Sequence, residues 1–486
     1  MAYVTRIVII GGGPGGYEAA LVAADLGAEV TVVDRDGLGG AAVLTDCVPS
    51  KTLIATAEVM TSFDSSYEEL GIRVGGEGPQ VGARVVGVDL GKVNRRVKRL
   101  AVAQSHDITQ SVTRAGVTLV RGSGRLAEGG QSVDGSRGVI VDLAEADGGG
   151  TRELRADAVL IATGTHPREL PDAVPDGERI LNWTQVYDLD ELPDELIVVG
   201  SGVTGAEFAG AYQALGSRVT LVSSRDRVLP GEDPDAANVL EDVFRRRGMN
   251  VMSQSRAESA RRVGDKVEVV LADGRVITGS HCLMAVGSIP NTAGLGLEAA
   301  GVKLTDGGQV QVDRVSRTTA PGVYAAGDCT GVFMLASVAA MQGRIAMYHA
   351  LGDAVQPLNL KTVASNVFTD PEIATVGYSA ADVECGKMDA VCVKLPLRGN
   401  PRAKMQGIRD GFVKLFCRPG TGIVVGGVVV APRASELIHP ISLAVDNNLT
   451  VEQVASAFTV YPSVSGSIAE AARQLHIRKR ETAAGA

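Results

Sequence analysis

Two glycine-rich segments of this sequence could each hold the phosphates of a dinucleotide. Residues 11–16 read Gly-Gly-Gly-Pro-Gly-Gly and satisfy the spacing G-x-G-x-x-G. In such a segment Gly11 allows a tight turn, Gly13 lets a pyrophosphate approach the backbone, and Gly16 permits a helix to pack closely on a strand. The N-terminus of the following helix would supply N–H groups and a positive dipole to the phosphates. Asp34, farther along, would accept a hydrogen bond from a ribose hydroxyl.

The second segment repeats this arrangement. Residues 200–205 read Gly-Ser-Gly-Val-Thr-Gly, and the step along the chain that leads from Gly11 to Asp34 leads from Gly200 to Ser223. Two such units predict two dinucleotides, with a decayed duplicate as the alternative. FAD and NAD(P)H are the natural pair for electron transfer.

The elements that must position these segments can be predicted from apolar patterning. Short continuous apolar runs before and after each glycine segment are typical of parallel strands buried on both faces. In order, the sequence predicts a strand at Val4–Ile10, a helix at Tyr17–Leu26, a strand at Glu29–Val33, a strand at Leu196–Val199, a helix ending near Leu215 and a strand at Arg218–Val222. The fold class is therefore α/β, with two Rossmann-like dinucleotide-binding domains.

Composition bounds the possibilities further. The chain has 486 residues, which exceeds one hydrophobic core and predicts roughly three domains of about 100–200 residues. A net charge of −9 does not favour nucleic acid or anionic membranes as partners. The N-terminal run resembles a strand and not a signal peptide, and no apolar run reaches the roughly 18–20 residues of a membrane span.

The cysteines point to a reducing compartment. The six residues Cys47, Cys282, Cys329, Cys385, Cys392 and Cys417 are scattered, with neither a CxxC pair nor zinc-ligand spacing. We therefore expect no metal site and a cytoplasmic location.

The segment Gly39–Lys51 resembles the redox signature of the flavoprotein disulfide reductases. That family includes dihydrolipoamide dehydrogenase, glutathione reductase and mercuric reductase, and its signature runs G-G-T-C-x-x-x-x-C-x-P-S-K. Further segments resemble other motifs of the family, and together they cover nearly the whole chain: Ala158–Gly164, Leu283–Thr292, Gly322–Asp328, Asn366–Gly377 and Gly426–Val430.

The resemblance implies a domain plan and a homodimer. It predicts a discontinuous FAD-binding domain (1–165 and 290–355), an NAD(P)H-binding domain (166–289), a C-terminal α+β dimerisation domain (356–476) and a flexible tail (477–486). In this family the C-terminal domain contributes an acid–base pair to the flavin of the neighbouring subunit.

The resemblance also implies which residues contact each cofactor. For FAD these are Gly11, Gly13, Pro14, Gly16, Asp34, Ala42, Lys51, Gly124, Thr163, Gly164, Gly327, Asp328 and Ala336. For NAD(P)H they are Gly200, Gly202, Val203, Thr204, Gly205, Glu207, Ser223, Ser224, Arg225 and Gly287.

Three departures from the family pattern fall on one piece of chemistry. Ala42 stands in place of the first cysteine, so Cys47 has no second thiol at the required spacing, and a disulfide needs two sulfurs. Tyr461 stands in place of the catalytic histidine of H-P-T-x-x-E, and Gly466 in place of its glutamate. A tyrosine titrates near pH 10, too high for an efficient base at neutral pH. The thiol–disulfide half-reaction should therefore be absent.

The flavin half-reaction keeps its expected residues. Lys51 and Glu207 match the ion pair that the family places beside the flavin N5. Taken alone, each is also compatible with an exposed helix residue. Cys47 precedes Pro49 and should lie at a helix N-terminus, where a thiol pKa is depressed. It would face the flavin as a thiolate, or alternatively be an inert buried thiol.

The pyridine nucleotide can be predicted from the end of the second strand of the 200–222 unit. NAD-specific relatives carry an acid there, whereas this chain carries Ser223, Ser224 and Arg225. Serine can donate to a 2′-phosphate and arginine can pair with it. NADPH should be accepted, with the alternative that Arg225 points to solvent and both donors are used.

These features predict an FAD-dependent NAD(P)H:quinone oxidoreductase, with the Tyr461 hydroxyl as a hydrogen-bond donor to a quinone oxygen. A soluble pyridine nucleotide transhydrogenase is the first alternative, although relatives of that kind carry threonine at the position of Cys47. A non-catalytic flavin-binding interaction protein is the second. The missing thiol contradicts dihydrolipoamide dehydrogenase. Mercuric reductase is disfavoured because no cysteine follows Cys417.

Overall fold

The computed structural model describes residues 4–65, 87–131 and 135–484, and its chain divides into two compact units. Unit 1 comprises Met1–Thr52, Asn94–Arg168 and Gly287–Asn359. Unit 2 comprises Leu53–Val93, Glu169–Val286 and Leu360–Ala486. Two helices, α3 (Cys47–Ser65) and α5 (Leu90–Arg114), run from one unit into the other.

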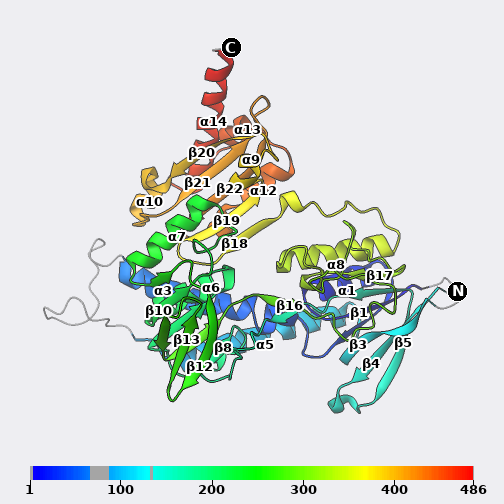
Figure 1. Ribbon diagram of the computed structural model, residues 1–486. Coiled ribbons are helices and arrows are strands. Elements are labelled where there is room, and N and C mark those ends of the chain that lie inside the picture. Colours follow the sequence, from blue (N-terminus) through cyan, green and yellow to red (C-terminus); the bar gives the residue numbers. More distant parts are fainter. Residues whose placement is uncertain (1–3, 66–86, 132–134, 485–486) are drawn as a thin grey trace. The chain divides into compact units, whose positions relative to one another are not determined.

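Unit 1 is built on a seven-stranded mixed sheet in the order β17-β6-β1-β2-β3-β4-β5 (Figure 1). The strands from β17 to β3 are parallel, and β3, β4 and β5 form an antiparallel meander. The strands are β1 (Arg6–Ile10), β2 (Glu29–Asp34), β3 (Thr118–Gln131), β4 (Arg137–Leu143), β5 (Thr151–Ala156), β6 (Ala158–Ile161) and β17 (Val323–Ala325), with β7 (Thr165–Pro167) and β16 (Ser288–Pro290) pairing separately.

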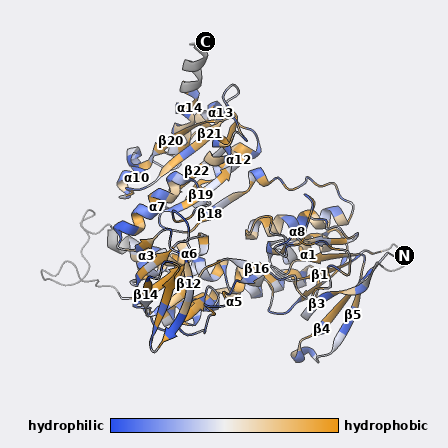
Figure 2. Ribbon diagram, viewed as in Figure 1, coloured by the Kyte–Doolittle hydropathy of each residue, from blue (hydrophilic) through white to orange (hydrophobic). Residues whose placement is uncertain are grey.

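The helices of unit 1 cover the parallel part of this sheet. Helix α1 (Pro14–Asp25) packs against α8 (Ala336–Ala350), and the short α2 (Gly40–Leu44) precedes α3. A Cβ on Gly343 of α8 would lie 2.1 Å from the carbonyl oxygen of Gly15, so only glycine permits this close helix contact. Strand residues of the parallel part of the sheet and residues of α1, α5 and α8 form the apolar core of this unit. Figure 2 shows the hydrophobic segments in orange.

The first half of unit 2 repeats the same layout. A five-stranded parallel sheet has the order β11-β10-β9-β15-β8, and a three-stranded antiparallel sheet β12-β13-β14 accompanies it. Its elements are β8 (Ile180–Asn182), β9 (Glu195–Val199), α6 (Val203–Leu215), β10 (Arg218–Val222), α7 (Pro234–Arg246), β11 (Asn250–Met252), β12 (Ala257–Val263), β13 (Lys266–Leu271), β14 (Val276–Gly279) and β15 (His281–Met284).

The C-terminal part of unit 2 is an antiparallel sheet covered by helices. The strand order is β18-β19-β22-β21-β20, and residues of this sheet share one core with residues of α12 and α14. Its elements are β18 (Ala364–Val367), β19 (Glu372–Gly377), α9 (Ala380–Glu384), β20 (Val391–Pro396), α10 (Pro401–Met405), β21 (Phe412–Cys417), β22 (Val424–Ala431), α11 (Ala434–Leu437), α12 (His439–Asp446), α13 (Val451–Ser456) and α14 (Gly466–Ala484).

The predicted strand–loop–helix–strand units are confirmed to within three residues at the element ends. The one difference lies at the C-terminus, where the expected tail over 477–486 is helical as far as Ala484 because α14 continues through it. The reason is that this polar segment consists largely of strong helix formers. Of the helices in the described parts of the chain, none combines the length and the apolar character needed to cross a membrane.

Candidate functional site

The first glycine loop joins β1 to α1 and has the geometry of a phosphate cradle. Gly11 has φ +106°, and a Cβ there would lie 2.3 Å from the carbonyl oxygen of Ala162, which follows β6. A Cβ on Gly16 would lie 1.9 Å from the carbonyl oxygen of Gly11. A Cβ on Gly13, by contrast, would approach nothing closer than Gly40 Cα at 3.9 Å. The loop is therefore closed against its own sheet and open at Gly13, before the N-terminus of α1, as a bound pyrophosphate requires.

Asp34, at the end of β2, organises this loop. Its Oδ2 accepts a hydrogen bond from the backbone N–H of Gly12 (2.6 Å), and its Oδ1 accepts from the N–H groups of Asp36 (2.8 Å) and Gly37 (2.6 Å). A carboxylate accepting three backbone donors is firmly oriented. The predicted ribose contact would thus be made by a side chain that is already fixed.

Hydrogen bonds hold the predicted flavin contacts at the ends of β6 and β17 in place. Thr163 donates through its hydroxyl to the carbonyl of Asn291 (2.7 Å), and the Asn291 amide donates to the carbonyl of Thr163 (2.8 Å). Gly164 follows with φ +67°. After β17, Gly327 has φ +82°, and its N–H donates to the buried side-chain oxygen of Gln342 (2.8 Å). No motif in the sequence points to Gln342.

Asp328 is the most perturbed carboxyl group in this set. Burial raises its pKa to about 6, and the nearby Asp46 carboxylate adds to the rise, while Thr165 opposes it weakly from 3.5 Å. A carboxylate kept partly desolvated is well suited to accept hydrogen bonds from hydroxyl groups of a ligand. This supports the predicted contact with the ribitol or pyrophosphate region of a flavin.

Asp328→Asn should stabilise the flavin-depleted protein and weaken its flavin binding. Because the folded-state pKa is raised, stability present below pH 4 is lost as the pH rises through about 6. Asparagine does not ionise, so the variant should unfold a few degrees above wild type at pH 7, and the difference should vanish toward pH 4. Thermal unfolding across this range, with flavin titration at pH 7, measures both effects. A variant that unfolded below wild type at pH 7 would contradict the assignment.

The second glycine loop, between β9 and α6, repeats the first. Gly200 has φ +111°, and a Cβ there would lie 2.2 Å from the carbonyl oxygen of Ala285, which follows β15. A Cβ on Gly205 would lie 1.8 Å from the carbonyl oxygen of Gly200, whereas nothing lies within 4 Å of a Cβ on Gly202. In both loops the first and third glycines of G-x-G-x-x-G therefore pack tightly against the backbone, whereas the second has free space around it. Val203 and Thr204 begin helix α6 beside that space.

The residues predicted to contact a 2′-phosphate occupy different environments. Ser224 and Arg225 are exposed, whereas Ser223 is fully buried (0% exposed). The Ser223 hydroxyl lies 2.7 Å from that of Ser201 and accepts from the N–H of Arg225 (3.1 Å). This geometry gives Ser223 an internal role and leaves Ser224 and Arg225 as the candidates for direct phosphate contact.

Glu207 is buried in the middle of α6 (3% exposed), which excludes the interpretation of it as a solvated helix carboxylate. Its Oε1 accepts a hydrogen bond from the backbone N–H of Phe368 (2.8 Å), just after β18. Lys51 lies in the second turn of α3 in unit 1, and Glu207 lies in unit 2. Their pairing beside a flavin stays a prediction.

Cys47 begins helix α3, as the sequence analysis expected, and is half-buried. Ala42 lies in the preceding short helix α2 and is also half-buried. An alanine side chain carries no sulfur, so no disulfide can form between positions 42 and 47.

Tyr461 lies on a highly exposed apolar loop. Its side chain is 83% exposed, and the neighbouring Val460 and Phe458 are exposed as well. Asn400, which the sequence analysis did not identify, fixes the C-terminal side of this loop. Its side-chain amide donates to the carbonyl of Ser463 (2.9 Å) and to the hydroxyl of Ser467 (2.8 Å).

Two neighbours of Tyr461 do not restore a histidine–glutamate pair. Gly466, where the family has its glutamate, begins α14. Glu470 lies one turn farther along, and its carboxylate is bonded to Arg473 (2.7 Å) and Gln474 (3.0 Å).

The remaining predicted residues lie as follows. Gly124 is buried in β3, where a Cβ would lie 3.2 Å from the Ile10 side chain, so a larger residue would crowd the packing there. Pro14 and Ala336 are the first residues of α1 and α8. Gly287 lies in the connection between β15 and β16, with φ +96°.

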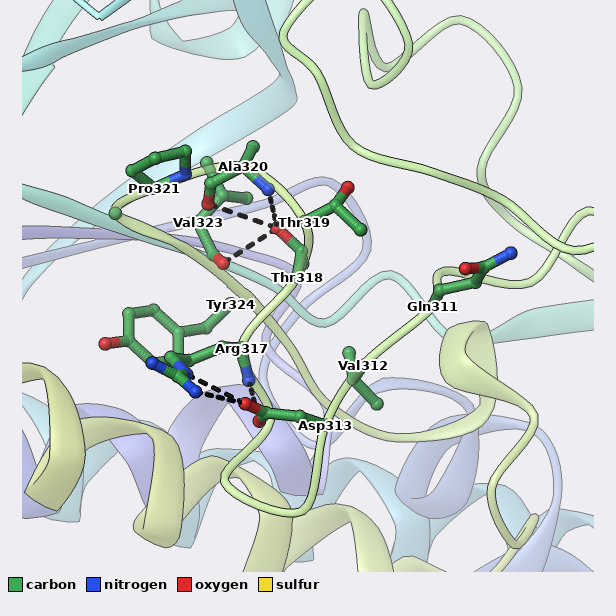
Figure 3. Close-up of a pocket in the computed structure, with 11 residues that line it drawn as sticks. Gln311, Val312, Asp313, Arg317, Thr318, Thr319, Ala320, Pro321, Val323 and Tyr324 are labelled. Atoms are coloured by element: carbon green, nitrogen blue, oxygen red, sulfur yellow. Dashed lines mark hydrogen bonds and ion pairs between the residues drawn. The ribbon is translucent and has the colours of Figure 1, made fainter.

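A hollow of about 490 Å³ on unit 1 lies away from the glycine loop. It is lined by residues 311–313 and 317–324, at the start of β17, whereas Asp328 follows the other end of that strand. Figure 3 shows Arg317 paired with Asp313 (2.8 Å) and the hydroxyl of Thr318 bonded to the backbone of Ala320 and Val323. Its charged lining residues are thus already bonded to each other, and the hollow is no part of the candidate site.

Comparison with known proteins places nearly the whole chain in one family. Residues 5–343 match the family described as pyridine nucleotide-disulphide oxidoreductase, and residues 363–472 match the dimerisation domain of that family. The chain is 56% identical over 475 residues to the NAD(P)H dehydrogenase (quinone) of Mycobacterium tuberculosis, covering 97% of this chain and 94% of the relative. It is 31% identical over 471 residues to the dihydrolipoyl dehydrogenase of Geobacillus stearothermophilus, covering 96% and 95%.

A solved structure gives the same result for the fold. The crystal structure of LpdA from Mycobacterium tuberculosis matches with a TM-score of 0.91 at 55% identity, covering 97% of this chain and 100% of that chain. The family match implies use of a flavin and of NAD(P)H, and both glycine loops fit such ligands. The chain therefore belongs to the pyridine nucleotide-disulphide oxidoreductases, the flavoprotein disulfide reductase family, as a member without the redox disulfide.

Proposed function

We propose that this protein is an FAD-dependent NAD(P)H:quinone oxidoreductase that works as a homodimer. The observation that carries the proposal is the combination of two intact glycine cradles with an alanine at position 42. The 56% identity to a protein named NAD(P)H dehydrogenase (quinone) supports the same acceptor. A dithiol acceptor such as lipoamide would need the thiol that this chain lacks.

We assign the cofactors to the domains as follows. FAD is held by residues 1–165 and 290–355, NAD(P)H by residues 166–289, and the dimer contact by residues 356–476. The match of residues 363–472 to a dimerisation domain supports the last assignment. A cytoplasmic location stays a prediction from the cysteine spacing and the N-terminal sequence.

The residues of each cradle have separate tasks. A bound flavin accepts two electrons from a reduced pyridine nucleotide and releases them to a second acceptor. Gly13 and the N-terminus of α1 would bind its pyrophosphate, and Asp34 and Asp328 would accept hydrogen bonds from its hydroxyl groups. Gly202 and the N-terminus of α6 would bind the pyrophosphate of NAD(P)H. Lys51 would place a cation beside the isoalloxazine ring, where it favours added negative charge.

Apolar surface and one hydroxyl group support a quinone as the electron acceptor. Ala42 offers a methyl group and Gly466 no side chain where relatives have polar groups, which suits a planar apolar ring. The Tyr461 phenol carries an O–H that can donate a hydrogen bond to a quinone oxygen.

Anaerobic spectroscopy tests this function. NADPH should bleach the yellow flavin of the purified protein under nitrogen, and a benzoquinone or naphthoquinone should restore the colour, whereas lipoamide and glutathione disulfide should not. Restoration by NADP⁺ analogues alone would favour the transhydrogenase alternative. Failure of NADPH and NADH to bleach the flavin would favour a non-catalytic protein.

A further inference from the structure

The two glycine loops differ at one pair of facing positions. In the first loop the pair is Gly12 and Asp34, and in the second it is Ser201 and Ser223. Gly12 and Ser201 are the second residues of their G-x-G segments, and Asp34 and Ser223 stand at the ends of β2 and β10. We name Ser201 and Ser223 the serine pair.

In the first loop a carboxylate meets a glycine. Asp34 Oδ2 accepts from the Gly12 N–H at 2.6 Å, and a Cβ on Gly12 would lie 3.1 Å from that same oxygen. The same Cβ would lie 2.5 Å from the side chain of Leu38. A side chain at position 12 would therefore overlap Leu38 and would also crowd the carboxylate at position 34.

In the second loop the serine pair fills the corresponding space with two hydroxyl groups. The Ser201 and Ser223 oxygens lie 2.7 Å apart, and both residues are buried, at 5% and 0% exposed. The shorter side chain at position 223 leaves room for the one at position 201. Relative to the first loop, the second therefore has serine in place of aspartate after the strand and serine in place of glycine in the loop.

The serine pair also fixes the segment that follows β10. Ser223 Oγ accepts from the N–H of Arg225 (3.1 Å) and lies 3.3 Å from the carbonyl oxygen of Arg227. The carbonyl of Ser201 accepts from the N–H of Leu229 at 2.8 Å. The Ser223 hydroxyl therefore contacts the backbone of Arg225 and Arg227, and the main chain of Ser201 holds Leu229. The side chains of Ser224 and Arg225 stay exposed.

We propose that Ser201 is a positioning residue that, through Ser223, sets a preference for NADPH over NADH. Ser223 stands where the first loop has the carboxylate of Asp34, which would repel a 2′-phosphate. The serine pair also holds Ser224 and Arg225 where they can bind that phosphate. The proposal rests on the proposed NAD(P)H site in unit 2 and adds to it a residue that positions the phosphate contacts. Because Ser201 acts through Ser223, the effects of changing the two should not add.

Direct binding separates this proposal from any effect on turnover. The probes are 2′,5′-ADP, which carries the 2′-phosphate, and 5′-AMP, which does not, titrated calorimetrically into the flavin-loaded protein. Wild type should bind 2′,5′-ADP at least about tenfold more tightly than 5′-AMP, as expected for a charge-assisted phosphate contact. Ser201→Ala should reduce that ratio about threefold or more while leaving the affinity for 5′-AMP unchanged, and it should have no further effect in a Ser223→Ala background.

A double variant that carries the first loop's residues at the positions of the serine pair should show the largest effect. Ser201→Gly/Ser223→Asp should abolish or reverse the preference for 2′,5′-ADP. Ser223→Asp alone should unfold at a lower temperature than this double variant, because the Ser201 side chain crowds the new carboxylate. Ser217→Ala is the matched control, since Ser217 is another buried serine of the same unit and, among the described residues, its hydroxyl has no hydrogen-bond partner. It should leave the ratio at the wild-type value.

Three other results of these titrations would contradict the proposal. A wild-type ratio near one, or a ratio unchanged in Ser201→Ala and in the double variant while both probes bind, overturns the role of the serine pair but leaves quinone reduction standing. Additive effects of the Ser201 and Ser223 substitutions overturn the claim that one acts through the other. Failure of wild type to bind either probe overturns the NAD(P)H site itself, and with it the proposed function.

Discussion

Lys51→Ala should slow reduction of the bound flavin by NADPH on the order of a hundredfold, which is the size of effect seen when one preorganised charge is removed from an active site. We expect this because Lys51 would place a cation beside the flavin ring, where it favours the negative charge added on reduction. Lys51 lies in the second turn of α3, four residues after Cys47. Stopped-flow absorbance at the flavin band measures the step. Because reduction precedes every acceptor, turnover with all quinones should fall together.

Two variants control for this prediction. Lys51→Arg keeps the cation and should retain more activity than Lys51→Ala, although guanidinium and ammonium groups are not interchangeable. Lys92→Ala removes an exposed lysine that pairs with Asp89 at 2.9 Å, and it should leave flavin reduction at the wild-type rate. Flavin reduction in Lys51→Ala within about threefold of wild type would contradict the role of the lysine.

Ala42→Cys alone should not create a disulfide reductase. Even if the new thiol pairs with Cys47, the relay still lacks its base and the group that orients the base, because Tyr461 and Gly466 stand in those places. Turnover with lipoamide or glutathione disulfide should stay below about one hundredth of the quinone rate, as expected when a residue of an acting unit is missing.

The comparison variant for this prediction restores all three positions. Ala42→Cys/Tyr461→His/Gly466→Glu should exceed the single variant in lipoamide turnover, because the three groups act as a unit. Lipoamide turnover by Ala42→Cys comparable with the quinone rate would show that the missing thiol alone accounts for the lost activity.

The glycine loops could be predicted from the sequence because their constraint is local. Gly16 must be glycine since its Cβ would overlap the carbonyl oxygen of Gly11, only five residues away, and the same holds for Gly205 and Gly200. The flanking strands carried a clear apolar pattern. Spacing and pattern together therefore fixed both βαβ units.

The environments of single side chains could not be predicted in this way. Glu207 is buried and accepts a hydrogen bond from the backbone of Phe368, 161 residues away along the chain. Asn400 holds a segment 63 residues away. The sequence predicts that Ser223 contacts a 2′-phosphate, yet in the structure its buried hydroxyl lies 2.7 Å from that of Ser201. Such long-range contacts leave no periodic signal in the sequence.

The central claim is that electrons leave the flavin for a quinone without help from a thiol. The most direct test is anaerobic stopped-flow mixing of the NADPH-reduced protein with a naphthoquinone, in wild type and in Cys47→Ser. We predict that the flavin absorbance returns in both proteins, with at most a modest loss of rate in the variant. If Cys47→Ser abolished this reoxidation while NADPH still reduced the flavin normally, the thiol would be catalytic and the account would be wrong.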